Sequence, residues 1–158
     1  MLSMPRELVK EKLLAFLRED VGQADITSQL VIRQEALAQA DVIVKESGVV
    51  AGLEEAQILL EAMGLTGKSL VADGAAIKSG ATLMHIEGNA RDLLTVERTL
   101  LNIISRMSGI ATKTRILQDA ASDANPSVKI VSTRKVAPGS LYFDKRAVMI
   151  GGGDSHRL

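Results

Sequence analysis

Two clusters of cationic side chains near the carboxyl end of the sequence are the residues best suited to chemistry. The first is Thr133, Arg134 and Lys135, which follows the apolar residues 128–132 and precedes a Pro-Gly turn. The second is His156 and Arg157, which follows three glycines. Loops after strands hold ligands in many α/β proteins, and glycines let the backbone approach a ligand closely. We therefore predict a site for a ligand with several carboxylates or phosphates, rather than solvated surface charges and a flexible tail.

The composition excludes several classes of function. Lys and Arg number 19 and Asp and Glu number 19, so no basic excess points to nucleic acid or to an acidic membrane surface. The sequence has no Trp, one Tyr and two Phe, too few for a base-stacking platform, and it has no cysteine for disulfides or thiolate metal sites. No apolar run approaches the ~18 residues of a membrane span, and the amino terminus is charged and amphipathic. These features predict a cytoplasmic globular protein.

Hydrophobic periodicity predicts the elements that hold these clusters in place. A helix is expected over residues 4–20, followed by a polar loop over 19–28 whose three carboxylates suit capping better than metal binding. The pattern then predicts, in order, a strand over 36–46, an extended piece over 48–52, a helix over 53–63, and short strands over 69–72, 75–77 and 82–87. His85 lies on the last of these strands and is expected to be a packed or surface residue.

The longest helix is predicted over residues 90–107, capped by Asn89 and carrying a wide apolar face. Ser108 and Gly109 are expected to break it, with a second helix over 110–121, a strand over 128–132 and a helix over 141–149. Residues 1–108 are therefore expected to form an α+β domain of helices on a small, mostly antiparallel sheet. Residues 109–158 are expected to begin a parallel β/α structure.

Arg98 stands between apolar positions of the longest helix. Such a side chain either pairs with Glu97 or another neighbouring carboxylate, or presents a cation to a ligand. The sequence alone leaves both interpretations open.

A series of motifs resembles one family, quinolinate phosphoribosyltransferase, also called carboxylating nicotinate-nucleotide pyrophosphorylase. The matching stretches, in order, are ED at 19–20 with DITS at 25–28, KESGVVAG at 45–52, ERTLLN at 97–102, SGIAT at 108–112, TRK at 133–135 with PG at 138–139, KRAV at 145–148, and GGG at 151–153 with HR at 156–157. Any one of these motifs is weak, whereas their shared order over almost the whole chain is specific.

The resemblance implies an enzyme that joins quinolinate to 5-phosphoribosyl 1-diphosphate with Mg²⁺ and releases pyrophosphate and CO₂, giving nicotinate mononucleotide for NAD synthesis. It implies that Thr133, Arg134, Lys135, His156 and Arg157 bind substrate at the mouth of a β/α barrel. It also implies a homodimer or larger assembly in which Arg98 reaches the partner subunit's site. Arginine's planar fork suits the paired carboxylates and the phosphates of these substrates.

The chain departs from the family pattern in two ways. Val136-Ala137 and Ser140-Leu141 stand where the family usually has Thr-Thr and an arginine. A complete barrel also needs roughly 250 residues, whereas residues 109–158 hold about one unit, so the acidic ligands of Mg²⁺ are expected beyond Leu158. We therefore expect an incomplete family member that is inactive alone. In it 1–108 folds as a unit while 109–158 stays mobile, exchanges between protomers or packs on a partner.

Three alternatives remain open from the sequence. Residues 73–83 resemble half of a biotinyl or lipoyl carrier domain, although Lys45 and Lys78 lack its flanking motif. The chain could instead be a non-catalytic metabolite-binding or dimerisation subunit of the same fold. It could also belong to an enzyme that uses a different aromatic acid.

Overall fold

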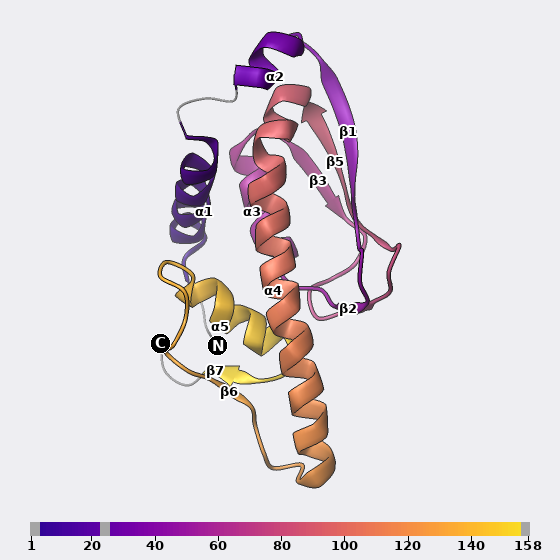
Figure 1. The fold of residues 1–158 in the computed structure, drawn as a ribbon, viewed down its shortest axis with the longest axis vertical. Coiled ribbons are helices and arrows are strands. Elements are labelled where there is room, and N and C mark those ends of the chain that lie inside the picture. The colour runs from indigo at the N-terminus through magenta and orange to yellow at the C-terminus, as the bar shows by residue number, and fades with distance from the viewer. Residues whose placement is uncertain (1–3, 23–25, 156–158) are drawn as a thin grey trace.

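A computed structural model describes residues 4–22 and 26–155 of the chain, and Figure 1 shows its fold. The helices and strands are α1 (Arg6–Val21), α2 (Ile26–Val31), β1 (Leu37–Ile43), β2 (Gly48–Val49), α3 (Leu53–Ala62), β3 (Thr66–Ser69), β4 (Ala76–Ile77), β5 (Thr82–Asn89), α4 (Ala90–Ala124), β6 (Val131–Ser132), α5 (Leu141–Ile150) and β7 (Asp154–Ser155). In this view α4 runs along the molecule, with the main sheet on one side and α1 and α5 on the other.

The main sheet has the order β1-β5-β3, and both of its pairings are antiparallel. Its inner face buries alternate residues such as Val42, Met84 and Ile86 against the helices, as period-two alternation requires. On the outer face Asp41 stands opposite His85, and His85 Nδ1 lies 2.5 Å from the Asp41 carboxylate. His85 is thus a surface residue, one of the two roles predicted for it.

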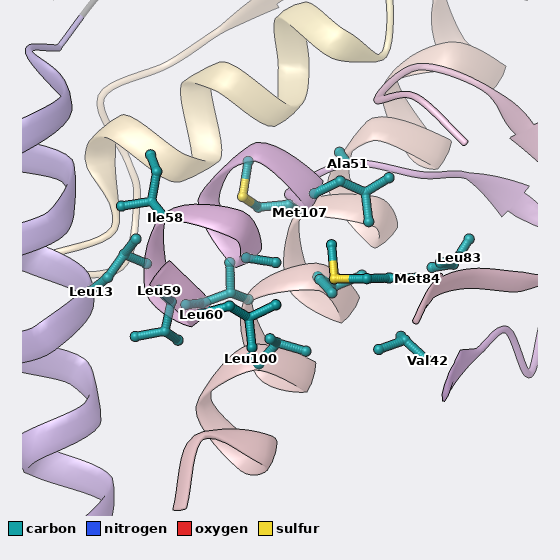
Figure 2. Packing of buried hydrophobic residues seen from close by; sticks show 14 of the residues in the cluster. Leu13, Val42, Ala51, Ile58, Leu59, Leu60, Leu83, Met84, Leu100 and Met107 are labelled. Atoms are coloured by element: carbon teal, nitrogen blue, oxygen red, sulfur yellow. The ribbon is translucent and has the colours of Figure 1, made fainter. Parts of the chain in front are cut away.

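One hydrophobic core joins the helices to this sheet. Leu13 of α1, Leu60 of α3, Met84 of β5 and Leu100 of α4 are all fully or almost fully buried in it (Figure 2). The same cluster includes Tyr142, Phe143 and Ala147 of α5. Residues 109–158 were expected to be mobile, to exchange between protomers or to pack on a partner. The structure instead packs α5 on the core of its own chain, because α5 has an apolar face of its own to bury.

The break predicted at Ser108 and Gly109 is wrong, because α4 continues through them to Ala124. Ser108 Oγ accepts a hydrogen bond from the Ala51 N–H at 3.0 Å, and Thr112 Oγ1 accepts one from the Val49 N–H at 2.8 Å. These contacts hold the helix on both sides of Gly109. They outweigh the ~1 kcal/mol by which glycine disfavours a helix relative to alanine.

Replacing Gly109 with alanine is therefore expected to stabilise the chain by about 0.5–1 kcal/mol. Among the residues that the structure describes, nothing outside α4 itself lies within 4 Å of a Cβ built on Gly109. Urea unfolding measures the change. The matched control is Gly151→Ala, whose Cβ would lie 2.5 Å from the Ala111 carbonyl oxygen, so this variant should be destabilised. Equal effects of the two substitutions would contradict this account.

Other differences from the sequence prediction also arise from tertiary contacts. The predicted polar loop over 19–28 missed α2, a helix too short to show periodicity, whose following residue Ile32 accepts a hydrogen bond from Arg91 Nε at 2.9 Å. β3 begins at Thr66, three residues before the predicted strand, because its pairing with β5 decides its position. The two-residue strand β7 was not predicted and forms by pairing with β6.

β6, α5 and β7 form a parallel βαβ unit, since β6 pairs with β7 in parallel and α5 connects them. The fold is thus an α+β domain followed by the first unit of a β/α structure, as predicted from the sequence.

Candidate anion-binding site

The parallel pair β6–β7 places side by side the two residues that precede the cationic clusters in the sequence. Ser132 pairs with Ser155, so Thr133 leaves β6 beside the last described residue of β7. The predicted site residues His156 and Arg157 follow immediately in the sequence and lie outside the described residues. Equivalent ends of parallel strands are a common place for ligand-binding groups in β/α proteins.

The side chains of Thr133, Arg134 and Lys135 are exposed. Thr133 Oγ1 accepts a hydrogen bond from the Lys135 N–H at 3.1 Å, which closes a local turn after the strand. Arg134 and Lys135 form no ion pair within the described part of the chain. The arrangement can therefore offer two cationic groups to an anion.

Arg98 lies on α4 and projects into solvent, with its side chain 74% exposed. Its Nη1 donates a hydrogen bond to Asp20 at the end of α1 over 3.2 Å. Its partner is thus a neighbouring carboxylate from another helix, and not Glu97. Arg98 and the exposed residues Thr133, Arg134 and Lys135 thus lie on different elements, α4 and the segment after β6.

A cavity of about 470 Å³ lies beside this ion pair, between α1, α4 and the start of α5. Its lining residues are Phe16, Glu19, Asp20, Thr99, Asn102, Ile103, Arg106, Met107, Ser140 and Phe143. Asp20 and Ser140 thus connect the surroundings of Arg98 with the end of the segment that carries Thr133, Arg134 and Lys135. The cavity mixes carboxylate, amide and hydroxyl groups with apolar walls.

Two groups of charged residues, which sequence reasoning did not identify as part of the site, hold α5 in place. On the α4 side, Arg106 donates from Nε and Nη2 to the two oxygens of Asp144, each at 2.8 Å. The hydrogen bonds to Asp144 raise the pKa of Arg106. This bidentate geometry fixes both the distance and the orientation of the two helices.

On the α3 side, Arg146 lies between Glu54 and the buried Glu55, with Nε 2.7 Å from the Glu55 carboxylate. Neither this Nε nor Glu55 Oε2 has a hydrogen-bond partner in the described structure. Burial raises the pKa of the Glu55 carboxyl, and the Arg146 guanidinium opposes that rise without cancelling it. Tyr142, Glu54 and Asp73 are the other titratable groups that interact electrostatically with Glu55 or Arg146.

Because the pKa of Glu55 is raised on folding, protonation of Glu55 favours the folded state. This contribution is fully present below the unfolded-state pKa and is lost as the pH rises through the folded-state pKa. We compare the free energy of unfolding of the natural chain with that of Glu55→Gln. As the pH is lowered from about 8 to about 5, this difference should increase in favour of the natural chain. Urea unfolding of both proteins at the two pH values measures it. A constant difference, or one of opposite sign, would disprove the assignment.

Within the described ranges, no group of three or more His, Cys, Asp or Glu side chains is arranged to hold a metal ion. None of the described helices is long and apolar enough to cross a membrane.

The fold and the exposed cationic strand end define the class of protein: an α+β domain joined to the start of a β/α barrel, with an exposed cationic loop after the barrel's first strand. Residues 25–108 match the family model described as quinolinate phosphoribosyl transferase, N-terminal domain, and residues 110–158 match the one for its C-terminal domain. The chain belongs to the quinolinate phosphoribosyltransferase family.

Individual relatives agree with this assignment. The chain is 42% identical over 142 residues to the "probable nicotinate-nucleotide pyrophosphorylase" (carboxylating) of Methanothermobacter thermautotrophicus. The aligned region covers 90% of this chain and 51% of that protein. It is 40% identical to the nicotinate-nucleotide pyrophosphorylase (carboxylating) of Mycobacterium leprae, with the same two coverages. The crystal structure of NadC from Streptococcus pyogenes superposes with a TM-score of 0.89 at 32% identity, covering 98% of this chain and 55% of that one. The chain thus spans about half the length of these relatives.

Proposed function

We propose that the chain contributes to the reaction of quinolinate with phosphoribosyl diphosphate that yields nicotinate mononucleotide, pyrophosphate and CO₂. The observation that carries this proposal is the adjacent match of two domains of one family over residues 25–108 and 110–158. The same matches support a division into an N-terminal domain over 1–108 and the start of a barrel domain over 109–158, although α4 is common to both.

In this proposal Thr133, Arg134, Lys135, His156 and Arg157 bind the carboxylates and phosphates of the substrates. The exposure of Arg134 and Lys135 and their freedom from ion pairs within the described residues support this role, because a cation already paired would have to exchange partners. The reaction separates a cationic ribosyl centre from pyrophosphate. Fixed positive charges can therefore assist by holding the phosphates and the departing group.

Arg98 is proposed to act in the site of a partner subunit of a homodimer or larger assembly. Its exposure supports this, because a side chain that is 74% exposed can reach a second subunit. Asp20 would then hold the guanidinium against its own subunit until an anionic ligand replaces Asp20 as its partner. Sedimentation velocity is expected to show at least a dimer.

Magnesium enters the proposal as a companion of the diphosphate. The described residues offer no ligand cluster for it, so we assign it no protein ligand among residues 4–22 and 26–155. The cytoplasmic location stays a prediction. Cell fractionation tests it, since relatives from plants are named chloroplastic or mitochondrial.

The test uses two proteins: this chain, and a chimera in which residues 1–158 replace the matching residues of the Methanothermobacter relative. We expect the chimera to form nicotinate mononucleotide from quinolinate and phosphoribosyl diphosphate, and the chain alone to form none above a no-enzyme control. A folded but inactive chimera that binds quinolinate would favour a non-catalytic subunit. Turnover by the chain alone would contradict the expectation that the site needs residues beyond these.

A further inference from the structure

Three polar side chains of α4 hold the backbone or side chains of the segment that carries the cationic cluster. They are Arg106, Arg115 and Gln118, and their partners lie within residues 128–151. These contacts are distinct from the substrate-binding groups and from the core.

Gln118 makes the most specific of these contacts. Its side chain is buried, with the residue 7% exposed. Its Nε2 donates to the Val128 carbonyl oxygen at 3.0 Å, and its Oε1 accepts from the Ile130 N–H at 2.9 Å. One side-chain amide thus satisfies the backbone of both residues as a strand neighbour would, directly before β6 begins. It fixes the position of the strand from which Thr133 emerges.

The other end of the βαβ unit is held by Arg115, whose Nε donates to the Gly151 carbonyl oxygen at 3.0 Å. The backbone itself packs closely there. A Cβ on Gly153 would lie 2.8 Å from the Ile130 carbonyl oxygen. The Asp154 N–H donates to that same oxygen at 2.8 Å. β7 is therefore held in register with β6 by backbone contacts, and these contacts leave no room for a side chain at position 153.

Between these two ends, the pair Arg106–Asp144 fixes the start of α5 on α4. Asp144 is buried, with the residue 7% exposed. Burying ions costs desolvation free energy, and apolar residues of similar volume often give equal or greater stability. A bidentate pair, however, favours the rotation of α5 that aligns both hydrogen bonds, whereas apolar side chains are less selective.

We propose that Gln118, Arg106 and Arg115 are positioning residues that set where the ends of β6 and β7 stand, and hence where Thr133, Arg134 and Lys135 meet an anionic substrate. The proposal rests on the proposed function for its substrate. The part of the proposal that concerns the positions of β6 and β7 depends only on the described contacts. Gln118 is the decisive member, because its two hydrogen bonds act directly on the strand entry.

The first experiment compares amide hydrogen exchange in the natural chain and in Gln118→Met, which removes at similar volume both hydrogen bonds to the strand and a third to Ser122 Oγ within α4. Expected is a loss of protection of roughly tenfold at the Asp154 amide, which donates to the Ile130 carbonyl oxygen of the neighbouring strand, with β1 and β5 unchanged. Ile130 is left out, because its own N–H bonds Gln118. The matched control is Gln57→Met on α3, where the glutamine side chain bonds Glu61 and no strand backbone among the described residues. Unchanged protection in Gln118→Met, an equal loss throughout the chain, or the same loss in the control would overturn the proposal.

A second variant, Arg106→Met with Asp144→Leu, separates positioning from stability. We expect a melting temperature equal to or above that of the natural chain, with protection at Asp154 reduced and the affinity for inorganic pyrophosphate lowered roughly tenfold. Full protection at Asp154 in a folded double variant would overturn the role of this pair. Failure of the natural chain to bind pyrophosphate would count against the proposed function, while the exchange comparison would still decide the positioning role.

Discussion

Replacing Arg98 with alanine in the chimera is expected to lower kcat/KM by a factor of about 10²–10⁴. A guanidinium can grip a carboxylate with two charge-assisted hydrogen bonds, each contributing about 1.5–3 kcal/mol, and every 1.36 kcal/mol is a factor of ten in rate. The residue is 74% exposed and makes one interhelical contact, with Asp20. Its loss should therefore leave the fold intact. Steady-state kinetics with quinolinate varied measures the effect.

The matched control is Arg33→Ala, which removes an exposed arginine outside the helices and should leave kcat/KM unchanged. Mixing subunits tests whether Arg98 acts across the interface. Inactive Arg98→Ala and inactive Arg134→Ala chimeras should regain activity when mixed, because a mixed dimer holds one site with both arginines. If each variant stays inactive after mixing and subunit exchange is demonstrated, the shared site is disproved.

Replacing Leu60 with alanine is expected to destabilise the chain by about 3–5 kcal/mol, in the upper part of the range for large-to-small core substitutions. Leu60 of α3 is fully buried between the helices and the sheet (Figure 2). Its Cδ1 fills the space above Gly67 of β3, 2.6 Å from where a Cβ on that glycine would stand. Because Gly67 has no side chain with which to close the gap, the cavity should persist. Urea denaturation measures the loss.

The matched control is Leu37→Ala, since Leu37 is 81% exposed and its truncation should change the free energy of unfolding by no more than about 0.5 kcal/mol. A domain with about 5–15 kcal/mol of total stability would lose a large share of it in Leu60→Ala alone. Similar effects of the two substitutions would show that the core is not where the structure places it.

Local sequence was sufficient for most of the element order. Apolar periodicity located α1, α3 and α5 closely, and Asn89 caps α4 as predicted, accepting a hydrogen bond from the Arg91 N–H at 2.9 Å. These features depend on neighbours a few residues apart, which a sequence displays directly. The motif order identified the family, and the domain matches confirmed it.

Tertiary structure decided the rest. α4 continues through Gly109 because residues 49 and 51 bond its side chains, some 57 to 63 positions away in sequence. Arg98 pairs with Asp20 across 78 positions, not with its neighbour Glu97. The alignment of Ser132 with Ser155 depends on how Gln118 and the glycines after α5 pack. The sequence by itself was thus sufficient to predict the fold class, the family and which cationic residues are candidates for binding. Only the folded chain determined their partners and positions, because contacts between distant segments leave no local pattern to read.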